Sequence, residues 1–283
     1  MAKREILRSF TTLKKDNINE LAIGGFDGVH LAHQELIKRI SNDNGAVLSI
    51  YRDTLALTPK EKRFRYIKNG GFLLHLDDIK ELSHKEFIEF LDKNFKNLKK
   101  IVVGYDFRYG KDRKGDIDTL KRDFRGEVVV VDEVKKDGIS VHTRVIKDFL
   151  LRAEIKKSSE LLGRDYSILS NLKKGQGIGK KMLFATLNLT QNSFFLPKNG
   201  VYVTDTKIGE RVYRSVTFIG IRESTDKEFS IESHIIGKNL DLDGYTGEIE
   251  TVFFDFIREN RRFDDLKDLK EQIKKDIVLS KSF

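Results

Sequence analysis

Short apolar runs alternate with helical patterns along the chain up to about residue 165. A short apolar run bounded by turn residues is typical of a buried strand, and Ser83 with Glu86 forms a capping box ahead of one helical pattern. The alternation predicts a mostly parallel sheet with helices on both faces. The expected strands are Leu21–Gly25, Ala46–Tyr51, Gly71–Leu76, Ile101–Gly104 and Val128–Val131, and the expected helices are Gln34–Ile40, Lys60–Asn69 and Lys85–Asn94.

From about residue 170 the pattern changes to strands separated only by turns. Without helical patterns between them, such strands predict a small antiparallel barrel. A helix then closes the chain, with Asp264 as its expected N-cap and an apolar stripe that we interpret as packing against the barrel. The expected strands are Gly200–Thr204, Tyr213–Ile219, Phe229–Ile236 and Glu248–Phe256, and the stripe consists of Leu266, Leu269, Ile273 and Ile277.

The two patterns predict two domains, residues 1–165 and residues 166–283. A chain of 283 residues exceeds the usual size of one domain, and 39% hydrophobic residues are enough for two cores. The junction is expected between a helix at Glu154–Leu162 and the first barrel strand.

Composition indicates the kind of cellular compartment expected for the chain. The absence of cysteine excludes disulfides and thiolate metal sites and fits a reducing compartment. No apolar run approaches the ~20 residues that a membrane-spanning helix needs, and Met1–Glu5 lacks the apolar core of a signal peptide. We therefore expect a cytoplasmic protein with no membrane partner.

The charge of the chain is basic but mixed in sign. Lys and Arg number 53 against 44 Asp and Glu, a net charge of +9, yet the two signs alternate, as at residues 60–63. Because no long single-sign block appears, we expect no nucleic-acid partner. A mildly basic surface also suits polyphosphate ligands.

A glycine-rich turn followed by two histidines is the first candidate site. It follows the strand expected at Leu21–Gly25, where ligands bind in open parallel sheets. His30 and His33 are three residues apart and share one face if a helix begins near His30, where an anion is also favoured. A zinc site is disfavoured because no third ligand has suitable spacing. The expected phosphate-binding residues are Gly24, Gly25, Phe26, Asp27 and Gly28.

This run resembles the G-x-F-D-G-x-H-x-G-H motif of the bacterial bifunctional riboflavin kinase/FMN adenylyltransferases, also called FAD synthetases, with Ala32 in place of one glycine. The resemblance implies a Rossmann-like α/β nucleotidyltransferase domain followed by a riboflavin kinase barrel with a C-terminal helix. It also implies that an FMN phosphate attacks the α-phosphorus of ATP and expels pyrophosphate. His30, His33 and Arg144 would then stabilise the charge of the transition state.

Two further segments of the first half match motifs of the family. The segment Val102–Gly110 resembles V-V-G-x-D-F-x-F-G, which implies flavin contacts from Tyr105, Asp106, Phe107 and Arg108. The segment Ser140–Arg144 resembles the start of I-S-S-T-R-I-R, which implies that Thr143 and Arg144 hold the triphosphate. The chain departs from the family at Ser49–Thr54, where a T-F-x-P-H-P-like loop is usual.

The second half carries an independent set of matches. Gly175–Asn188 resembles G-x-G-x-G-R-x-L-G-F-P-T-A-N, which implies Mg²⁺ ligation by Thr186 and Asn188. Ile231–His234 resembles V-E-x-H/F, which implies that Glu232 accepts the proton of the ribityl 5′-hydroxyl. The phosphate flap implied by the first motif comprises Gly175, Gly177, Gly179 and Lys180, and further matches are Gly200–Tyr202, Ile219–Arg222, Gly247–Glu259 and Arg262–Phe263.

The resemblance thus predicts a Mg²⁺-dependent enzyme with riboflavin, FMN and ATP as small-molecule partners and FMN and FAD as products. Two alternatives stay open. Departures at Tyr51–Thr54, Ala185 and Leu187 favour a scaffold with only one active half. A basic chain on a dead enzyme fold could instead be a nucleotide- or RNA-binding regulator, for which steep salt dependence of RNA binding is the sign.

Overall fold

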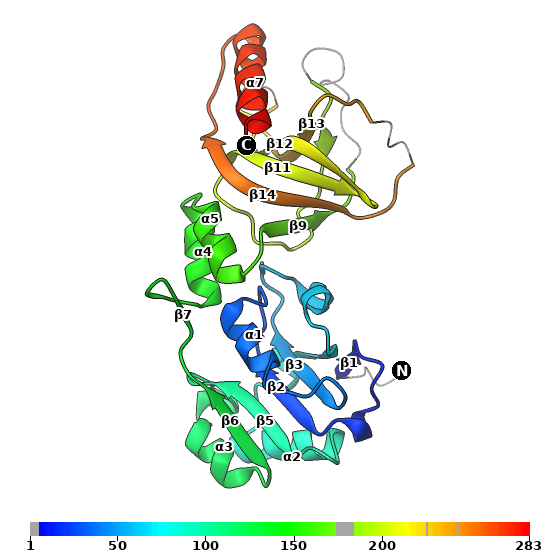
Figure 1. Ribbon diagram of the computed structural model, residues 1–283, viewed down its shortest axis with the longest axis vertical. Helices are drawn as coiled ribbons and strands as arrows, with labels where there is room; N and C mark the ends of the chain where they lie inside the picture. The colour runs from blue at the N-terminus through cyan, green and yellow to red at the C-terminus, as the bar shows by residue number, and fades with distance from the viewer. Residues whose placement is uncertain (1–5, 174–183, 225, 241, 243) are drawn as a thin grey trace. The chain divides into compact units, whose positions relative to one another are not determined.

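A computed structural model describes residues 6–173, 184–224, 226–240, 242 and 244–283 of the chain. Its contacts divide the chain into two units, Met1–Thr143 and Arg144–Phe283 (Figure 1). By this division the helices α4 (Thr143–Leu151) and α5 (Ile155–Leu162) fall almost entirely in the second unit. The assignment of separate activities to residues 1–165 and 166–283 stays a prediction.

The first unit is built on a six-stranded sheet with the strand order β1-β4-β3-β2-β5-β6. All neighbouring strands are parallel except β1, which pairs antiparallel with β4 at one edge. The predicted parallel sheet is therefore confirmed, and the edge strand β1 is an addition. The strands are β1 (Leu7–Ser9), β2 (Glu20–Gly24), β3 (Gly45–Tyr51), β4 (Gly71–His75), β5 (Lys100–Gly104) and β6 (Glu127–Val131).

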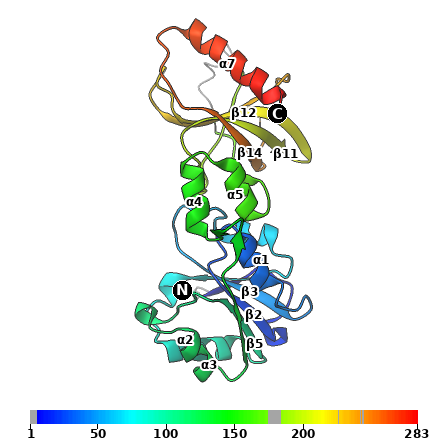
Figure 2. The same ribbon diagram turned by 60° about the vertical axis from the view of Figure 1, so that its left-hand side comes forward.

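Helices cover both faces of this sheet (Figure 2). One buried cluster joins the sheet to α2 (His84–Asn94) and α3 (Ile117–Asp123), and a second cluster joins it to α1 (Leu31–Ile37). Alternate residues of each strand point to opposite faces, so the two clusters take alternate positions of β2, such as Leu21 and Ala22. The capping box of Ser83 and Glu86 is present, as predicted. A short hairpin, β7 (Lys135–Lys136) and β8 (Ile139–Ser140), precedes α4.

The helix predicted at Lys60–Asn69 is wrong in kind and in length. The structure has a 3₁₀ segment at Lys60–Tyr66, preceded by Pro59. Arg63 on this segment is buried and donates Nε–H to the Thr58 carbonyl at 2.9 Å. A buried side chain that bonds back to the preceding loop overrides the helical propensity of the sequence. Other 3₁₀ turns lie at Lys15–Asn17, Leu76–Asp78 and Lys111–Arg113.

The second unit is a six-stranded antiparallel sheet with the order β10-β13-β12-β11-β14-β9. An antiparallel bridge between Leu172 and Leu189 joins the chain just beyond the two edge strands, so the sheet closes on itself. This confirms the predicted barrel. The strands are β9 (Tyr166–Ser170), β10 (Leu187–Asn188), β11 (Gly200–Ile208), β12 (Arg211–Ile221), β13 (Phe229–Ile235) and β14 (Ile249–Arg258).

Five hydroxyl groups form a closed ring of hydrogen bonds among the barrel strands. All five side chains are fully buried. Each hydroxyl oxygen lies 2.6–3.2 Å from two others of the set, so every hydroxyl in the ring can donate one bond and accept one. In ring order the residues are Thr204, Ser215, Thr206, Ser233 and Thr217, which we call the hydroxyl ring.

The closing helix α7 (Leu266–Lys281) packs on β12 and β11, as predicted. Its N-cap is Asp265 and not Asp264, because the Asp265 side chain accepts from the Lys267 N–H at 2.7 Å. The fully buried residues of α7 are both polar, Asp276 and Ser280. The apolar stripe is less buried than predicted, and Leu269 and Ile273 instead line a cavity.

A buried ion pair joins α7 to the barrel. The guanidinium of Arg258, at the end of β14, donates Nε–H and Nη2–H to the Asp276 carboxylate at 2.8–3.1 Å. Gln272 donates to the same carboxylate at 2.8 Å. The Asp276 side chain is 1% exposed, so its charge depends on these partners for compensation.

We expect Asp276→Asn to lower the free energy of unfolding of the second unit by about 3 kcal/mol, because the Arg258 guanidinium, whose side chain is 19% exposed, then loses its counterion. Urea unfolding of the full chain measures the change. The matched control is Glu271→Gln on the same helix, whose ion pair with Lys274 is exposed on both sides and should contribute less than about 1 kcal/mol. Equal effects of the two substitutions would contradict this account.

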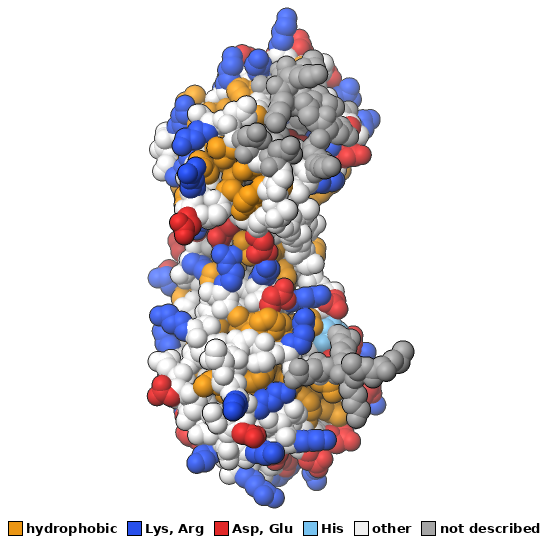
Figure 3. Space-filling view, turned by 90° about the vertical axis from the view of Figure 1, so that its right-hand side faces the viewer, with side chains coloured by type: hydrophobic (Ala, Val, Ile, Leu, Met, Phe, Trp, Pro, Cys, Tyr) orange, Lys and Arg blue, Asp and Glu red, His pale blue; other side chains and the backbone are white. Residues whose placement is uncertain are grey.

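Charged side chains of both signs intermix over the molecular face in Figure 3, as the sequence predicts. Many form close pairs, such as Lys80 with Asp77 and Lys111 with Glu81. Among the described residues, the helices are too short or too polar to cross a membrane.

Candidate functional site

The turn between β2 and α1 is strained. Gly28 has φ +89°, and two larger residues, Phe26 and Val29, have φ +48° and +43°. A non-glycine residue held at such an angle costs on the order of 1–3 kcal/mol. Phe26 and Val29 are fully buried, so the core holds them in this conformation. Backbone strain of this kind clusters at functional sites.

The two predicted histidines lie side by side at the start of α1. His30 is the N-cap, and its Nδ1 accepts a hydrogen bond from the His33 N–H at 3.4 Å. The two imidazole rings stack with centroids 3.6 Å apart, and the ring of His33 lies 5.0 Å from that of Phe26. His30 is 4% exposed, whereas His33 is partly exposed. His33 is therefore the more accessible of the pair, and His30 also supports the helix.

Side chains from distant segments hold the glycine-rich turn. The Gly28 N–H donates to Thr58 Oγ1 at 2.7 Å, and the Thr58 N–H donates to Asp27 Oδ1 at 3.0 Å. Thr143 Oγ1 donates to the Asp27 carbonyl at 2.9 Å. These bonds bring the first candidate motif and the Thr143 motif to one place.

Arg63 is a residue of this site that sequence analysis missed. Its Nη1–H donates to the Gly25 carbonyl at 2.7 Å and to Ser49 Oγ at 2.9 Å. Burial lowers the pKa of the Arg63 guanidinium, and the charge of Asp27 acts against this shift. A buried cation thus lies against the turn expected to bind phosphate. Its signal in the sequence was only one arginine in a run of charged residues.

The four predicted flavin-binding residues differ in their surroundings. Tyr105 and Asp106 are exposed after β5, and the Tyr105 hydroxyl lies 3.2 Å from His142 Nε2. Phe107 packs against the core and stacks on Tyr109. Arg108 forms an ion pair at 3.0 Å with Asp116. The first two are thus accessible to a ligand, while the last two also have structural contacts.

For Arg144 and the flap residues, the other residues predicted to bind phosphate, contact with a phosphate stays a prediction. Arg144 is exposed and belongs to the second unit, directly after Thr143, so its role beside His30 and His33 stays a prediction. The flap residues Gly175, Gly177, Gly179 and Lys180 lie outside the described residues.

The barrel brings Thr186, Asn188 and Glu232 together. Asn188 of β10 pairs in register with Glu232 of β13, and Thr186 lies two residues before Asn188, just ahead of β10. Thr186 Oγ1 donates to Glu232 Oε2 at 3.5 Å. His234, two residues after Glu232, hydrogen-bonds through Nδ1 to the Ala185 carbonyl at 2.9 Å and so fixes the segment that carries Thr186.

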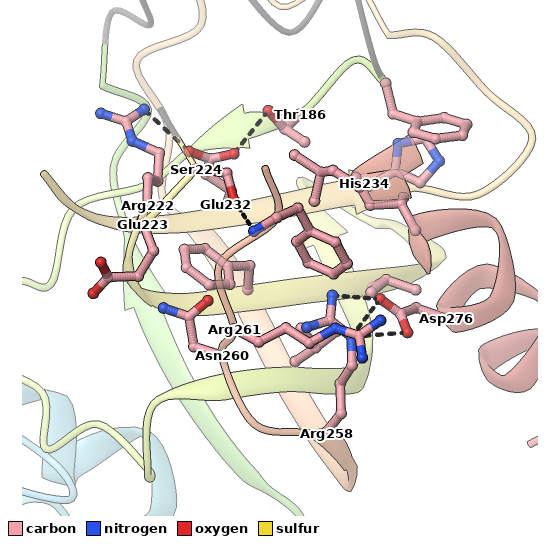
Figure 4. A pocket seen from close by; sticks show the side chains of 17 residues that line it. Thr186, Arg222, Glu223, Ser224, Glu232, His234, Arg258, Asn260, Arg261 and Asp276 are labelled. Carbon is pink, nitrogen blue, oxygen red and sulfur yellow. Dashed lines mark hydrogen bonds and ion pairs between the residues drawn. The ribbon is translucent and has the colours of Figure 1, made fainter. Parts of the chain in front are cut away.

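A cavity of about 170 Å³ opens beside Glu232 (Figure 4). Figure 4 shows the Glu232 carboxylate between Thr186 and Arg222. Elsewhere the wall is mostly apolar, with the Arg258–Asp276 ion pair at its α7 side. Wall residues that sequence analysis gave no role are Phe184, Val201, Val216, Phe218, Arg222, Glu223, Ser224, His234, Arg258, Asn260, Arg261, Phe263 and Asp276.

A second cavity, of about 400 Å³, lies on the Asn188 side and is more polar. Lys173, Gln191 and Ser230 line it together with Asn188. Within the described part of the chain, no cluster of three or more His, Cys, Asp or Glu side chains could hold a metal ion. Hard cations such as Mg²⁺ prefer oxygen ligands, and nucleotide phosphates can supply most of them. The hydroxyl of Thr186 and the amide oxygen of Asn188 are side-chain oxygens of the kind that could complete such a site.

Two family models match the chain, in the order that the motifs predict. A model described as FAD synthetase matches residues 45–145, and a model described as riboflavin kinase matches residues 162–283. A crystal structure described as a macrolide-efflux protein from Streptococcus pneumoniae superposes with a TM-score of 0.80 at 25% identity, covering 97% of this chain and 96% of that one.

Curated relatives match over nearly the full chain. A bifunctional riboflavin kinase/FMN adenylyltransferase of Buchnera aphidicola is 30% identical and covers 99% of this chain and 98% of its own length. The enzyme of the same description from Bacillus subtilis is 29% identical over 90% of this chain and 89% of its own. With both family models and full-length relatives in agreement, the chain belongs to the bifunctional riboflavin kinase/FMN adenylyltransferase family.

Proposed function

We propose that this chain phosphorylates riboflavin to FMN with ATP and then adenylylates FMN to FAD with release of pyrophosphate. Phosphorylation is assigned to residues 166–283 and adenylyl transfer to residues 1–165. The matches of the two family models to 162–283 and 45–145 support this division. ATP and the flavins are the proposed small-molecule partners, and the cytoplasm is the proposed location.

The observation that carries the kinase proposal is the position of Glu232 at a cavity wall beside Thr186. A half-buried carboxylate can accept the proton of the ribityl 5′-hydroxyl as that oxygen attacks the γ-phosphorus of ATP. The new O–P bond forms as the bond from the γ-phosphorus to the bridging oxygen breaks, and ADP leaves. The apolar wall of the 170 Å³ cavity fits an aromatic flavin ring.

Thr186 and Asn188 are proposed to hold Mg²⁺ together with the phosphates of ATP. When bound, the ion would draw charge from the phosphate oxygens. Thr186 donates to Glu232, Asn188 pairs in register with Glu232, and both side chains are partly exposed, so they can reach a ligand.

The adenylyl transfer proposal rests on the histidine pair and the turn that Thr58, Arg63 and Thr143 hold. In this reaction an FMN phosphate oxygen attacks the α-phosphorus of ATP as the bond to pyrophosphate breaks, without a covalent enzyme intermediate. Such a transfer depends on positioning and on donors aimed at the developing charge. His33 is the proposed donor to that charge, and the buried Arg63 adds a positive charge behind the turn.

Chromatography of flavins after incubation with riboflavin, ATP and Mg²⁺ tests both activities at once. FMN followed by FAD supports the full proposal. FMN alone, with supplied FMN left unconverted, would restrict activity to the second half. No flavin product from either substrate would overturn the proposal and favour a binding protein, which salt-dependent RNA binding would then test.

Thr186→Val is expected to lower the kinase rate at least about 10-fold, because it keeps the shape of the side chain and removes one proposed Mg²⁺ ligand. The loss should not recover fully at high Mg²⁺. The matched control is Thr251→Val, which removes a buried barrel hydroxyl that has no hydrogen-bond partner among the described residues. An unchanged rate and Mg²⁺ dependence in Thr186→Val would exclude Thr186 as a ligand.

A further inference from the structure

Arg222 lies at a junction of three carboxylates beside the kinase cavity. Its Nη1–H donates to Glu232 Oε1 at 3.1 Å, and its Nη2 lies 2.6 Å from Asp226 Oδ2 and 3.4 Å from Glu228 Oε2. The backbone fixes its position as well, because the Arg222 N–H donates to the Glu228 carbonyl at 3.0 Å directly after β12. Its side chain is 22% exposed.

The two oxygens of Glu232 have different surroundings. Oε1 accepts from Arg222 and also from Ser230 Oγ at 2.8 Å. Oε2 accepts one hydrogen bond within the described part of the chain, from Thr186 Oγ1 at 3.5 Å. Oε1 is thus engaged by two donors, whereas Oε2 faces the residue proposed to lie beside the nucleotide phosphates. The carboxylate has a fixed orientation with one oxygen available to accept a proton.

Arg222 is the one described residue that lines both the 170 Å³ cavity and the 400 Å³ cavity. It therefore lies between the cavity that fits the flavin ring and the polar cavity beside Asn188. Its Nε is buried without a hydrogen-bond partner among the described residues. Leaving a buried N–H without a hydrogen bond costs free energy. The orientation of the Arg222 side chain therefore satisfies Nη1 and Nη2, which contact the carboxylates, and leaves Nε without a partner among the described residues.

We infer that Arg222 is a positioning residue of the kinase: with Ser230 it holds Glu232 by Oε1, so that Oε2 is the oxygen that takes the ribityl proton. This inference rests on the proposed function of Glu232. A purely structural role for Arg222 would be to hold the chain after β12 in place through its ion pairs with Asp226 and Glu228. That structural role would not require contact with Glu232, and it predicts that substitutions of Arg222 and Glu232 affect the kinase rate independently.

A double-mutant cycle on the full-length protein tests the inference, with kcat and KM for riboflavin measured by FMN formation. Arg222→Met should lower kcat about 10- to 100-fold, the range for a hydrogen bond to a charged group, and change KM and riboflavin binding less than about 3-fold. In the Glu232→Gln background the same substitution should cost less than about 3-fold, because Arg222 acts through that carboxylate. Additive losses would overturn the inference.

Controls separate this inference from folding and from the proposed function. Arg214→Met removes an arginine within β12, which is paired with Asp205 at 3.2 Å and lines neither cavity, and it should leave kcat unchanged. If Arg222→Met does not fold, Ser230→Ala removes the other Oε1 donor and should lower kcat about 2- to 10-fold at unchanged KM. A normal kcat in that variant would also overturn the inference.

The two proposals fail separately. If Glu232→Gln is slow but Arg222→Met is not, only the role of Arg222 is excluded. A normal rate in Glu232→Gln overturns the proposed function of Glu232 itself.

Discussion

Glu232→Gln is expected to lower the rate of riboflavin phosphorylation by about 10²–10⁴-fold, the range for a positioned general base. The amide keeps the size of the side chain and can still accept from Arg222 and Ser230, but it cannot take the ribityl proton. Riboflavin binding should therefore change little. The rate is measured by FMN formation, and binding by the quenching of riboflavin fluorescence.

The matched control for Glu232 is Glu250→Gln on β14. Both glutamates belong to the barrel sheet, and their side chains are 20% and 15% exposed, but Glu250 does not line the kinase cavity. This control should keep a normal kinase rate. Adenylylation of supplied FMN should continue in both variants. A near-normal kinase rate in Glu232→Gln would make Glu232 a structural strand residue.

His33→Ala is expected to slow FMN adenylylation by about 10²–10³-fold, the usual loss when one preorganised donor to a developing charge is removed. His33 is the more exposed member of the stacked pair, so its loss leaves the helix cap at His30 in place. Riboflavin phosphorylation should persist. Conversion of supplied FMN and ATP to FAD and pyrophosphate measures the first effect, and conversion of riboflavin to FMN measures the second.

His84→Ala is the control for this prediction. His84 begins α2 and is paired with Asp123 at 3.1 Å, at a helix that packs on the opposite face of the sheet from α1. Its replacement should leave the adenylylation rate within about 3-fold, as for a surface change away from the site. Equal loss of both activities in a folded His33→Ala variant would contradict separate sites.

Hydropathy patterns were enough to predict both architectures, because each depends on a repeated local signal. Buried parallel strands such as β5 are built on continuous apolar runs, and barrel strands follow one another with only turns between them. Segments without such a repeat were missed or wrong. The 3₁₀ turn at Lys60–Tyr66 exists because Arg63 is buried against Gly25 and Ser49, contacts that no local pattern records.

Motifs located the histidine pair, Thr143, Thr186 and Glu232, but gave no role to the residues that hold them. Arg63 and Arg222 occur in mixed-charge runs, where an arginine is usually solvated. The α7 stripe shows the same limit. Its apolar spacing predicted the helix, yet the fully buried residues of α7 are Asp276 and Ser280, and Arg258, the partner of Asp276, lies 18 residues away on a strand. Pairing across elements is a property of the folded chain and not of a short window.

The hydroxyl ring restricts how the barrel core can change during evolution. Threonine and valine have nearly the same shape, so a single exchange would fill the space but leave two neighbouring hydroxyls with a missing donor or acceptor. A second change at Ser215 beside one at Thr206 would not remove this cost, because the remaining hydroxyls would still end unpaired at Ser233 and Thr204. In related chains these five positions should therefore vary as a group, with hydroxyl residues retained or lost together.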